Sequence, residues 1–359
     1  MVIHKNFIGG NIRVISQNDD NVYVENELRD TQGDWFYWAF CVENAEGKTV
    51  TFHFQDVRLG YYGPAVSHDL VEWHWLGEKG ENEFTYTFEK GENKVYFAHS
   101  MLYHPDRFLQ FAKTNGFEVN EFCKSQKGRS LPYIEFGCGE RSIVLTSRHH
   151  ACESTGNYVL EGVLIELSRK PIENTKILCV PFVDYDGVVD GDQGKNRNPW
   201  DHNRDYDYNQ PSIYEVTQKI KEYVENNGCN YAFDFHAPWH WGKQNDKVFI
   251  VQKSYEGADR LNVFGEILED SITDGALKYS HADDYEFGVG WNKYAPSLCR
   301  YVIEREENEL AFTLETTYFG LSDNVVSQEN MVELGRCFAR ALKRYIAEKE
   351  GKIPLVKVR

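Results

Sequence analysis

Two residues with metal-binding side chains, His150 and Glu153, stand three positions apart in the sequence. Imidazole and carboxylate groups are typical zinc ligands, and zinc sites often combine such a close pair with a distant third ligand. The spacing alone is weak, because such pairs also occur by chance. The run RSIVLTSR at 141–148 predicts a buried strand before the pair, and STGNYVLEGVLIELS at 154–168 predicts a helix after it. The pair is therefore expected at the carboxyl end of a strand, where open α/β sheets bind their ligands.

A third candidate ligand is His236, at the end of the predicted strand CNYAFDFH at 229–236. Asp234 lies two residues earlier on the same side of the strand, where it or a neighbour could accept a hydrogen bond from the second ring nitrogen of His236. His240 is a rival, although Pro238 argues against a helix that presents both histidines on one face. A lone histidine at a strand end is also often structural, and both interpretations stay open here.

The run ELAFTLE at 309–315 predicts an apolar strand that ends in Glu315. Burial beside a metal would make this carboxylate useful as a base near neutral pH. Taken alone, Glu315 is interpreted as an ordinary glutamate on an edge strand.

A long polar stretch at 184–211 contains the cations Lys195, Arg197 and Arg204. It is too long and too polar to be only a connection between two elements. Its cations could bind an anion, and a surface loop without a ligand is the alternative.

A sheet with covering helices is needed to bring these residues together. Longer apolar strands alternate with amphipathic helices in the second part of the chain, which predicts a mixed-sheet α/β domain at 96–359. One helix is predicted from a capping box at Ser212 and Glu215 to Gly228, and another over 327–351.

Residues 1–95 consist of short alternating runs, such as VYVENELR and EFTYTFEKG, broken by Gly, Asn and Asp. This pattern predicts an antiparallel β-sandwich domain ahead of the α/β domain. Aromatic residues that alternate along a strand more often pack inside than bind carbohydrate, so its tryptophans are expected in the core. These tryptophans are Trp35, Trp38, Trp73 and Trp75.

Lysine and arginine total 39 against 56 for aspartate and glutamate, a formal net charge of −17. Such a field repels phosphate backbones and anionic lipids, so neither nucleic acid nor a membrane is expected as a partner. No run approaches the roughly 18 apolar residues of a membrane span, and the first residues lack the pattern of a secretory signal. A cytoplasmic location is expected, and the eight cysteines, which form no CxxC pair, are expected to be reduced and mostly buried.

Five segments resemble motifs of the zinc metallocarboxypeptidases, and among these of the cytosolic carboxypeptidases, which carry a β-sandwich ahead of the catalytic domain. SRHHACE resembles the family's R-x-H-P-G-E, DYDGV its N-P-D-G-V and DHNRDY its D-L-N-R. DFHAP resembles D-L-H-G-H, and TLETTYFG resembles T-L-E-S-T-F-C-G. The resemblance covers nearly the whole chain, and five motifs in order are more specific than any one of them.

This resemblance implies one zinc ion per chain, with water in the fourth coordination position. It also implies that Glu315 is the catalytic glutamate. Asn203 and Arg204 match the pair that binds the terminal carboxylate of the substrate, a task that suits a planar guanidinium. The implied metal ligands are His150, Glu153 and His236.

The chain departs from the family pattern at the arginine that faces the oxyanion. Gly194 stands at the aligned position, so Lys195 or Arg197 must take the role, and Arg197 is preferred here. Ala151 and Cys152 replace Pro-Gly inside the metal motif, so a Cys152 thiolate could compete for the metal.

Two further matches concern the substrate side chain. Arg300 matches a family arginine associated with acidic side chains, and Tyr294 is a candidate for the mobile tyrosine that covers the substrate.

The expected function is therefore that of a zinc carboxypeptidase, which removes C-terminal residues from peptides or protein tails with Glu315 as general base. Glutamate is one candidate for the residue removed. A zinc amidohydrolase that acts on an N-acyl amino acid or a cell-wall peptide is one alternative. The other is a catalytically silent protein that binds peptides or glycans through its aromatic amino-terminal sandwich.

Overall fold

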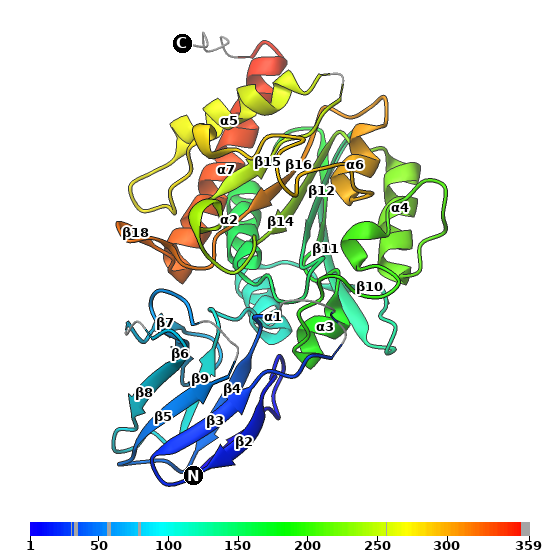
Figure 1. Cartoon of the computed structure of the whole chain (residues 1–359). Coiled ribbons are helices and arrows are strands. Elements are labelled where there is room, and N and C mark those ends of the chain that lie inside the picture. Colours follow the sequence, from blue (N-terminus) through cyan, green and yellow to red (C-terminus); the bar gives the residue numbers. More distant parts are fainter. Residues whose placement is uncertain (30, 32–34, 56–58, 78–79, 256, 353–359) are drawn as a thin grey trace.

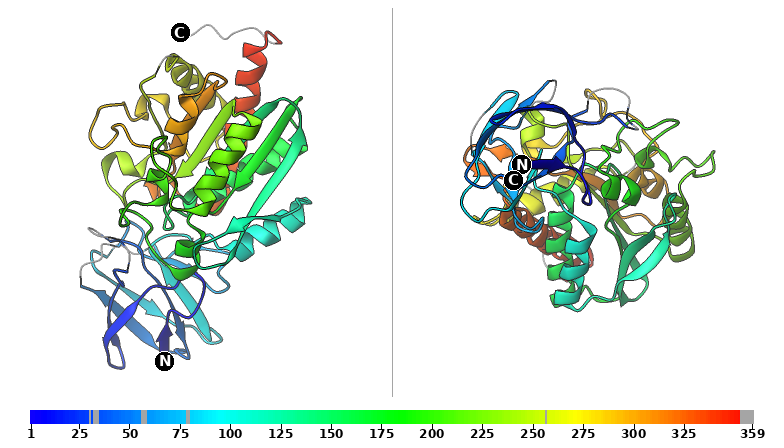
Figure 2. Two further views of the ribbon diagram at one scale, coloured as in Figure 1. Left: turned by 90° about the vertical axis from the view of Figure 1, so that its right-hand side faces the viewer. Right: turned by 90° about the horizontal axis from the view of Figure 1, so that it is seen from below.

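The computed structural model describes residues 1–359 except residues 30, 32–34, 56–58, 78–79, 256 and 353–359 (Figure 1). An all-β amino-terminal lobe is followed by a larger α/β lobe, and the amino terminus lies at the far end of the first lobe (Figures 1 and 2). This architecture confirms the predicted fold class, a β-sandwich followed by a mixed-sheet α/β domain.

Two sheets form the amino-terminal lobe. Among the described residues, their strands are β1 (Val2–His4), β2 (Arg13–Gln17), β3 (Asn21–Glu25), β4 (Ala39–Glu43), β5 (Thr49–Phe54), β6 (Ala65–Ser67), β7 (His74–Trp75), β8 (Glu83–Thr87) and β9 (Lys94–Ala98). The strand orders are β1-β4-β9-β6-β7 and β2-β3-β5-β8. Neighbours pair antiparallel except β3 and β5, which are parallel. The chain between β3 and β5 crosses to the other sheet as β4, so no hairpin forces these two strands to be antiparallel.

The tryptophans of this lobe are core residues. Trp38 lies in the apolar layer between the two sheets. Trp35 and Trp73 are buried on the opposite side, in the layer shared with the α/β lobe. Trp75 is half-buried against the same layer, and its indole N–H donates to the carbonyl of Val326 at 2.9 Å. The prediction of a packed aromatic core is confirmed, and the two lobes share apolar contacts.

A seven-stranded sheet organises the second lobe. Its strands are β10 (Asn120–Lys124), β11 (Ser130–Cys138), β12 (Arg141–Ser147), β13 (Thr175–Val180), β14 (Tyr231–His236), β15 (Phe249–Val251) and β16 (Leu310–Glu315), and a small hairpin adds β17 (Gly320–Leu321) and β18 (Asn324–Val325). The strand order is β10-β11-β13-β12-β14-β16-β15. The four central strands are parallel to one another, and the outer pairs β10–β11, β11–β13 and β15–β16 are antiparallel.

Helices cover both faces of this sheet (Figure 1). They are α1 (Pro105–Asn115), α2 (Thr155–Arg169), α3 (Tyr185–Asp190), α4 (Glu215–Asn227), α5 (Asp259–Ser271), α6 (Leu298–Ile303) and α7 (Gln328–Lys349), with 3-10 turns at His202–Arg204, Lys243–Asp246 and His281–Asp283. The helices α2, α5 and α7 share one apolar layer, and α4 and α6 share the other. Along β14, Phe233 and Phe235 face the first layer and Ala232 faces the second. Asp234 and His236 therefore point to the α4 and α6 side, because successive side chains alternate.

The predicted helix over 154–168 is present as α2, and the helix predicted over 327–351 is present as α7. The side chain of Ser327 accepts a hydrogen bond from the backbone N–H of Asn330, which begins α7 with a capping box.

The capping box predicted at Ser212 and Glu215 is wrong. The helix α4 begins at Glu215 with Tyr214 before it, and the Ser212 hydroxyl instead donates to the carbonyl of Asp205 at 2.9 Å. The Asp205 carboxylate accepts hydrogen bonds from the backbone N–H groups of Ile213 and Tyr214, at 2.9 and 3.1 Å. A distant carboxylate therefore binds the N–H groups ahead of the helix, which a local sequence pattern does not reveal.

The boundary predicted near residue 95 falls inside β9, so we propose that the first domain ends at Ala98 and the second begins before α1. Among the described helices, none is both long and apolar enough to cross a bilayer. All eight cysteines are free thiols, and only Cys138 is exposed, as predicted. The cytoplasmic location stays a prediction.

Candidate metal and catalytic site

Three neighbouring parallel strands end at the candidate site. His236 and Glu315 are the last residues of β14 and β16 and pair with each other in the sheet, and His150 follows β12 by three residues. The carboxyl ends of parallel strands meet at one edge of a sheet, so these side chains converge. Glu153, in the turn before α2, joins them. The ligand atoms of His150, Glu153 and His236 all lie within 4.8 Å of one another.

The Glu153 carboxylate lies between the two imidazoles. Its Oε1 is 2.8 Å from Nδ1 of His150, and its Oε2 is 2.7 Å from Nδ1 of His236. The structure thus brings together the three residues predicted as ligands. Two imidazoles and one carboxylate are a donor set that catalytic zinc sites use, with the fourth position left for water or substrate.

His236 also belongs to a second group of potential ligands through its other ring nitrogen, together with His149 and Asp234. Its Nε2 lies 2.6 Å from Asp234 Oδ2, while Asp234 Oδ1 lies 2.8 Å from Nδ1 of His149. These residues are buried on all sides, so the group offers no access to a substrate. His150 keeps 12% of its side chain exposed. The accessible group is therefore the candidate catalytic site, and Asp234 orients His236, as predicted.

His149 is a residue of this site that sequence reasoning did not single out. Its Nε2 lies 2.7 Å from the hydroxyl oxygen of Tyr206, so a buried chain of contacts runs from His236 through Asp234 and His149 to Tyr206. The only signal in the sequence is the adjacent histidine pair, and its first member has no partner at a recognisable spacing.

The loop that carries the metal motif is built on Arg148, which has a left-handed backbone with φ of 62°. Its buried guanidinium donates to the carbonyls of Ala151 and Tyr103, at 2.8 and 3.0 Å, and to Oδ1 of Asn157 at 3.2 Å. These bonds satisfy a buried cation and hold the loop against the start of α2. Arg148 is thus a structural residue of the motif.

One buried carboxylate oxygen of the site, Oε2 of Glu315, has no hydrogen-bond partner among the described residues. Leaving such an oxygen without a partner is costly, and a bound cation would compensate for it. The residues at this edge of the sheet therefore fit a divalent metal.

Glu315 is buried beside His236, with which it pairs in the sheet. Burial raises its pKa to about 7, which Glu153 reinforces and His236 opposes. A carboxyl group with a pKa in this range can accept and return a proton near neutral pH, whereas an ordinary glutamate is a weaker base.

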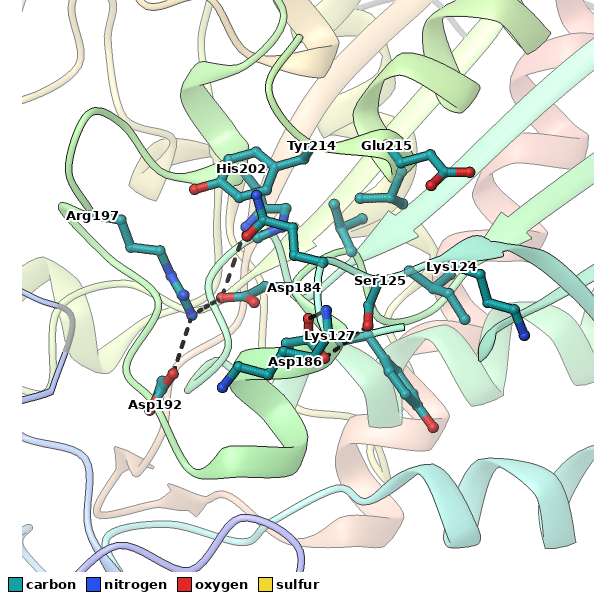
Figure 3. Close-up of a pocket in the computed structure, with 15 residues that line it drawn as sticks. Lys124, Ser125, Lys127, Asp184, Asp186, Asp192, Arg197, His202, Tyr214 and Glu215 are labelled. Atoms are coloured by element: carbon teal, nitrogen blue, oxygen red, sulfur yellow. Dashed lines mark hydrogen bonds and ion pairs between the residues drawn. The ribbon is translucent and has the colours of Figure 1, made fainter. Parts of the chain in front are cut away.

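The sequence left open whether Lys195 or Arg197 faces the oxyanion, and the surroundings of these two cations differ. Nζ of Lys195 lies 2.6 Å from Oε1 of Glu153, inside the site. Nη2 of Arg197 lies 2.5 Å from Asp184 and 3.7 Å from Asp192, beside a small cavity of about 50 Å³ (Figure 3). The structure therefore brings Lys195 to the metal motif, whereas Arg197 pairs with carboxylates outside this motif.

Asn203 and Arg204 form the 3-10 turn that follows Asp201. Asp201 Oδ1 accepts the backbone N–H of Asn203 at 3.1 Å and lies 3.7 Å from Nε2 of His150, so the same carboxylate links this turn to the metal motif. The amide oxygen of Asn203 is buried without a hydrogen-bond partner among the described residues, while Arg204 is exposed. The charge of Arg204 lowers the pKa of Asp201 and of Lys253, so this cation lies close to the metal motif.

A further cation, Arg300, lies on α6 with its guanidinium over two aromatic rings. The ring of Tyr294 is 5.1 Å away and the ring of Phe287 is 5.9 Å away, and Nη1 donates to the carbonyl of Ser254 at 3.3 Å. Tyr294 is 65% exposed, so its ring lies at the surface. Lys253 adjoins this position, and its pKa is lowered by burial and by the charges of Arg300 and Arg204.

Neither rival ligand joins the group. Burial raises the pKa of the Cys152 thiol to about 12, and this thiol accepts a hydrogen bond from the Tyr318 hydroxyl at 3.6 Å. His240 instead stacks on the ring of Phe36 at 4.9 Å. The potential metal-binding groups among the described residues include neither Cys152 nor His240.

Comparison with known proteins agrees with this geometry. Residues 3–99 match the family described as the cytosolic carboxypeptidase N-terminal domain. A metallo-carboxypeptidase of Burkholderia cenocepacia superposes with a TM-score of 0.79 at 17% identity, over 97% of this chain and 99% of the other. The chain has the fold and the amino-terminal domain of the cytosolic metallocarboxypeptidases. The resemblance found in the five sequence motifs is thereby confirmed.

Two other proteins extend the comparison. A metallo-carboxypeptidase of Pseudomonas aeruginosa has a TM-score of 0.76 at 18% identity, over 97% of this chain and the whole of the other. Cytosolic carboxypeptidase 2 of Xenopus tropicalis is 22% identical over 76% of this chain, which spans only 31% of that protein's length.

Proposed function

We propose that the chain is a zinc-dependent carboxypeptidase that hydrolyses the C-terminal peptide bond of peptides or protein tails. The observation that carries the proposal is the convergence of His150, Glu153 and His236 at the sheet edge where Glu315 also ends its strand. The buried Oε2 of Glu315, which has no hydrogen-bond partner among the described residues, supports a cation at this place.

Glu315 acts as the general base. A zinc ion bound here would lower the pKa of a coordinated water toward about 7 and polarise the scissile carbonyl. Glu315 accepts the proton that the attacking water loses and returns it to the leaving amine. Its pKa of about 7, raised by burial, suits both directions of this transfer.

Asn203 and Arg204 bind the terminal carboxylate of the substrate. The exposed guanidinium of Arg204 supports this role, because arginine binds carboxylates through two parallel hydrogen bonds. The Pseudomonas aeruginosa enzyme was crystallised with (2-guanidinoethylmercapto)succinic acid, a ligand that carries carboxylates. A substrate carboxylate bound beside the site would place the last peptide bond there, which makes the proposed activity that of an exopeptidase.

Arg300 sets the preferred side chain. Its guanidinium and the nearby Lys253 ammonium form a positive region in an otherwise acidic protein of net charge −17. We infer a preference for acidic C-terminal residues.

Peptides with free and amidated C-termini test this function directly. The wild type should release single residues from the free form and leave the amide intact. Arg204→Met should raise KM for the free form at least tenfold, a loss of about 1.4 kcal/mol, whereas the exposed Arg169→Met at the end of α2 should behave as wild type. Equal cleavage of free and amidated peptides would contradict the proposal, and cleavage limited to single N-acyl amino acids would favour an amidohydrolase.

A further inference from the structure

The amino-terminal lobe reaches the segment that carries Lys195. The backbone N–H groups of Phe36 and Tyr37 donate to Oε1 of Gln193 at 2.8 and 3.3 Å. The hydroxyl of Thr31 donates to the carbonyl of Lys195 itself at 2.7 Å. Contacts from the amino-terminal lobe therefore hold the segment on both sides of residue 194, through the Gln193 side chain and the Lys195 carbonyl.

The other side of the same segment packs on the metal motif. The backbone N–H of Cys152 donates to the carbonyl of Gln193 at 3.1 Å. Gly194 has a φ of 76°, and a Cβ there would lie 2.4 Å from the backbone nitrogen of Ala151. No side chain fits at position 194 with this backbone, so the nearest cation that can reach the site comes from the next residue.

Lys195 extends from this segment into the site. Its side chain is 13% exposed, its Nζ lies 2.6 Å from Oε1 of Glu153, and it lies 5.8 Å from the centre of the Phe36 ring. Phe36 is itself buried and stacks on His240. A cation held over an aromatic face in a desolvated place gains stabilisation from that ring, so Phe36 limits where the ammonium can go.

We propose that the amino-terminal lobe completes the active site by positioning Lys195, through Gln193 and Phe36, as the cation that faces the developing oxyanion. This inference rests on the carboxypeptidase function proposed above. Lys195 is the catalytic residue in this account, because it faces the reacting atoms. Gln193 and Phe36 are positioning residues, because they act only through Lys195.

Affinity for a phosphinic dipeptide, whose tetrahedral oxyanion imitates the transition state, provides a readout besides activity. It is measured by calorimetry on zinc-loaded protein and compared with affinity for the free amino acid product. Lys195→Met should lower kcat and phosphinic affinity by about 100- to 1,000-fold, as lost oxyanion donors do, while zinc stoichiometry and product affinity change little.

Gln193→Ala should lower kcat and phosphinic affinity between about 10- and 100-fold, because a displaced catalytic group loses efficiency steeply. Gln328→Ala is the matched control. Gln328 is also a buried amide of the second lobe that accepts a backbone N–H from the first, that of Trp73 at 2.9 Å. Its side chain donates to the carbonyl of Val71 and the hydroxyl of Tyr158, which lie outside the Lys195 segment. The variant Gln328→Ala should lower the melting temperature and leave kcat and phosphinic affinity unchanged.

The double variant Gln193→Ala/Lys195→Met decides between positioning and general destabilisation. If Gln193 acts through Lys195, the double variant should be no slower than Lys195→Met alone. Phe36→Leu, which keeps apolar bulk without an aromatic face, should behave like a milder Gln193→Ala. Additive losses in the double variant, or a kcat of Gln193→Ala within about twofold of Gln328→Ala, would overturn the inference. An inactive wild type would instead count against the proposed function.

Discussion

The Lys195 ammonium lies 2.6 Å from a carboxylate oxygen of Glu153, whereas the Arg197 guanidinium, two residues later, lies 2.5 Å from Asp184. In the resemblance to the family motifs, Asp184 stands in the place of an asparagine and Gly194 in the place of an arginine. The buried Asp184–Arg197 pair therefore explains why Arg197 is present without reaching the metal motif. The sequence preference for Arg197 over Lys195 at the oxyanion is not supported by this placement.

Arg197→Met should destabilise the protein more than it slows catalysis. Burial raises the pKa of Asp184, which Arg197 opposes, so removal of the arginine leaves a buried carboxylate uncompensated. The free energy of unfolding should fall by roughly 3 kcal/mol at pH 8, and by less in acid, where Asp184 can protonate. The double variant Asp184→Asn/Arg197→Met should recover most of the loss in urea denaturation. A kcat lowered 100-fold at unchanged stability would return the oxyanion role to Arg197.

Glu315→Gln should abolish turnover while zinc stays bound. The amide has nearly the same shape as the carboxylate but cannot accept a proton, so kcat should fall by about 100- to 10,000-fold. Metal content by atomic absorption and steady-state kinetics check this together. Glu306→Gln, an exposed glutamate outside the site, is the control and should match wild type. The assignment fails if Glu315→Gln keeps even a tenth of wild-type kcat.

The pH profile of kcat/KM should have an acid limb controlled by Glu315. The group must be unprotonated to act as a base, so activity is present above its pKa and is lost as pH falls through it. Burial raises this pKa to about 7, and a bound cation lowers it, which places the limb at or below pH 7 and above the ordinary range of a glutamate. Rates measured from pH 4.5 to 9 at constant ionic strength test this, and a flat profile across the acid range would contradict it.

Arg300→Ala should change selectivity rather than overall chemistry. The guanidinium rests over the ring of Tyr294 at 5.1 Å and is the partner that we propose for an acidic side chain. Competition between peptides that end in glutamate and in leucine should show kcat/KM for glutamate lowered at least tenfold, about 1.4 kcal/mol, with leucine little affected. Unchanged selectivity would rule out this residue as the acidic-side-chain determinant.

The convergence of the metal group could be predicted from the sequence, because each of the parallel strands is recognisable as a buried apolar run. Buried apolar runs before His150, at His236 and at Glu315 indicate strands, and strand ends of a parallel sheet meet at one edge. The parallel pairing of β3 with β5 could not be predicted, since it depends on β4 crossing to the other sheet.

Contacts between distant residues account for what the sequence did not reveal. Asp205 binds the N–H groups ahead of α4 from another segment. The place of His149 in the site depends on its contacts with Asp234 and Tyr206, which are distant in the sequence. The choice between Lys195 and Arg197 depends on which carboxylate lies nearest in space, a relationship that spacing along the chain does not encode.

The most direct test of the central claim is zinc stoichiometry, measured on the purified protein and on His150→Ala, combined with amino acid release from a mixed set of peptides. We expect one zinc per chain, lost in the variant, and single residues released from the carboxyl end by the wild type alone. Zinc bound without release of C-terminal residues would contradict the carboxypeptidase assignment, and a wild type that binds no zinc would contradict the metal site itself.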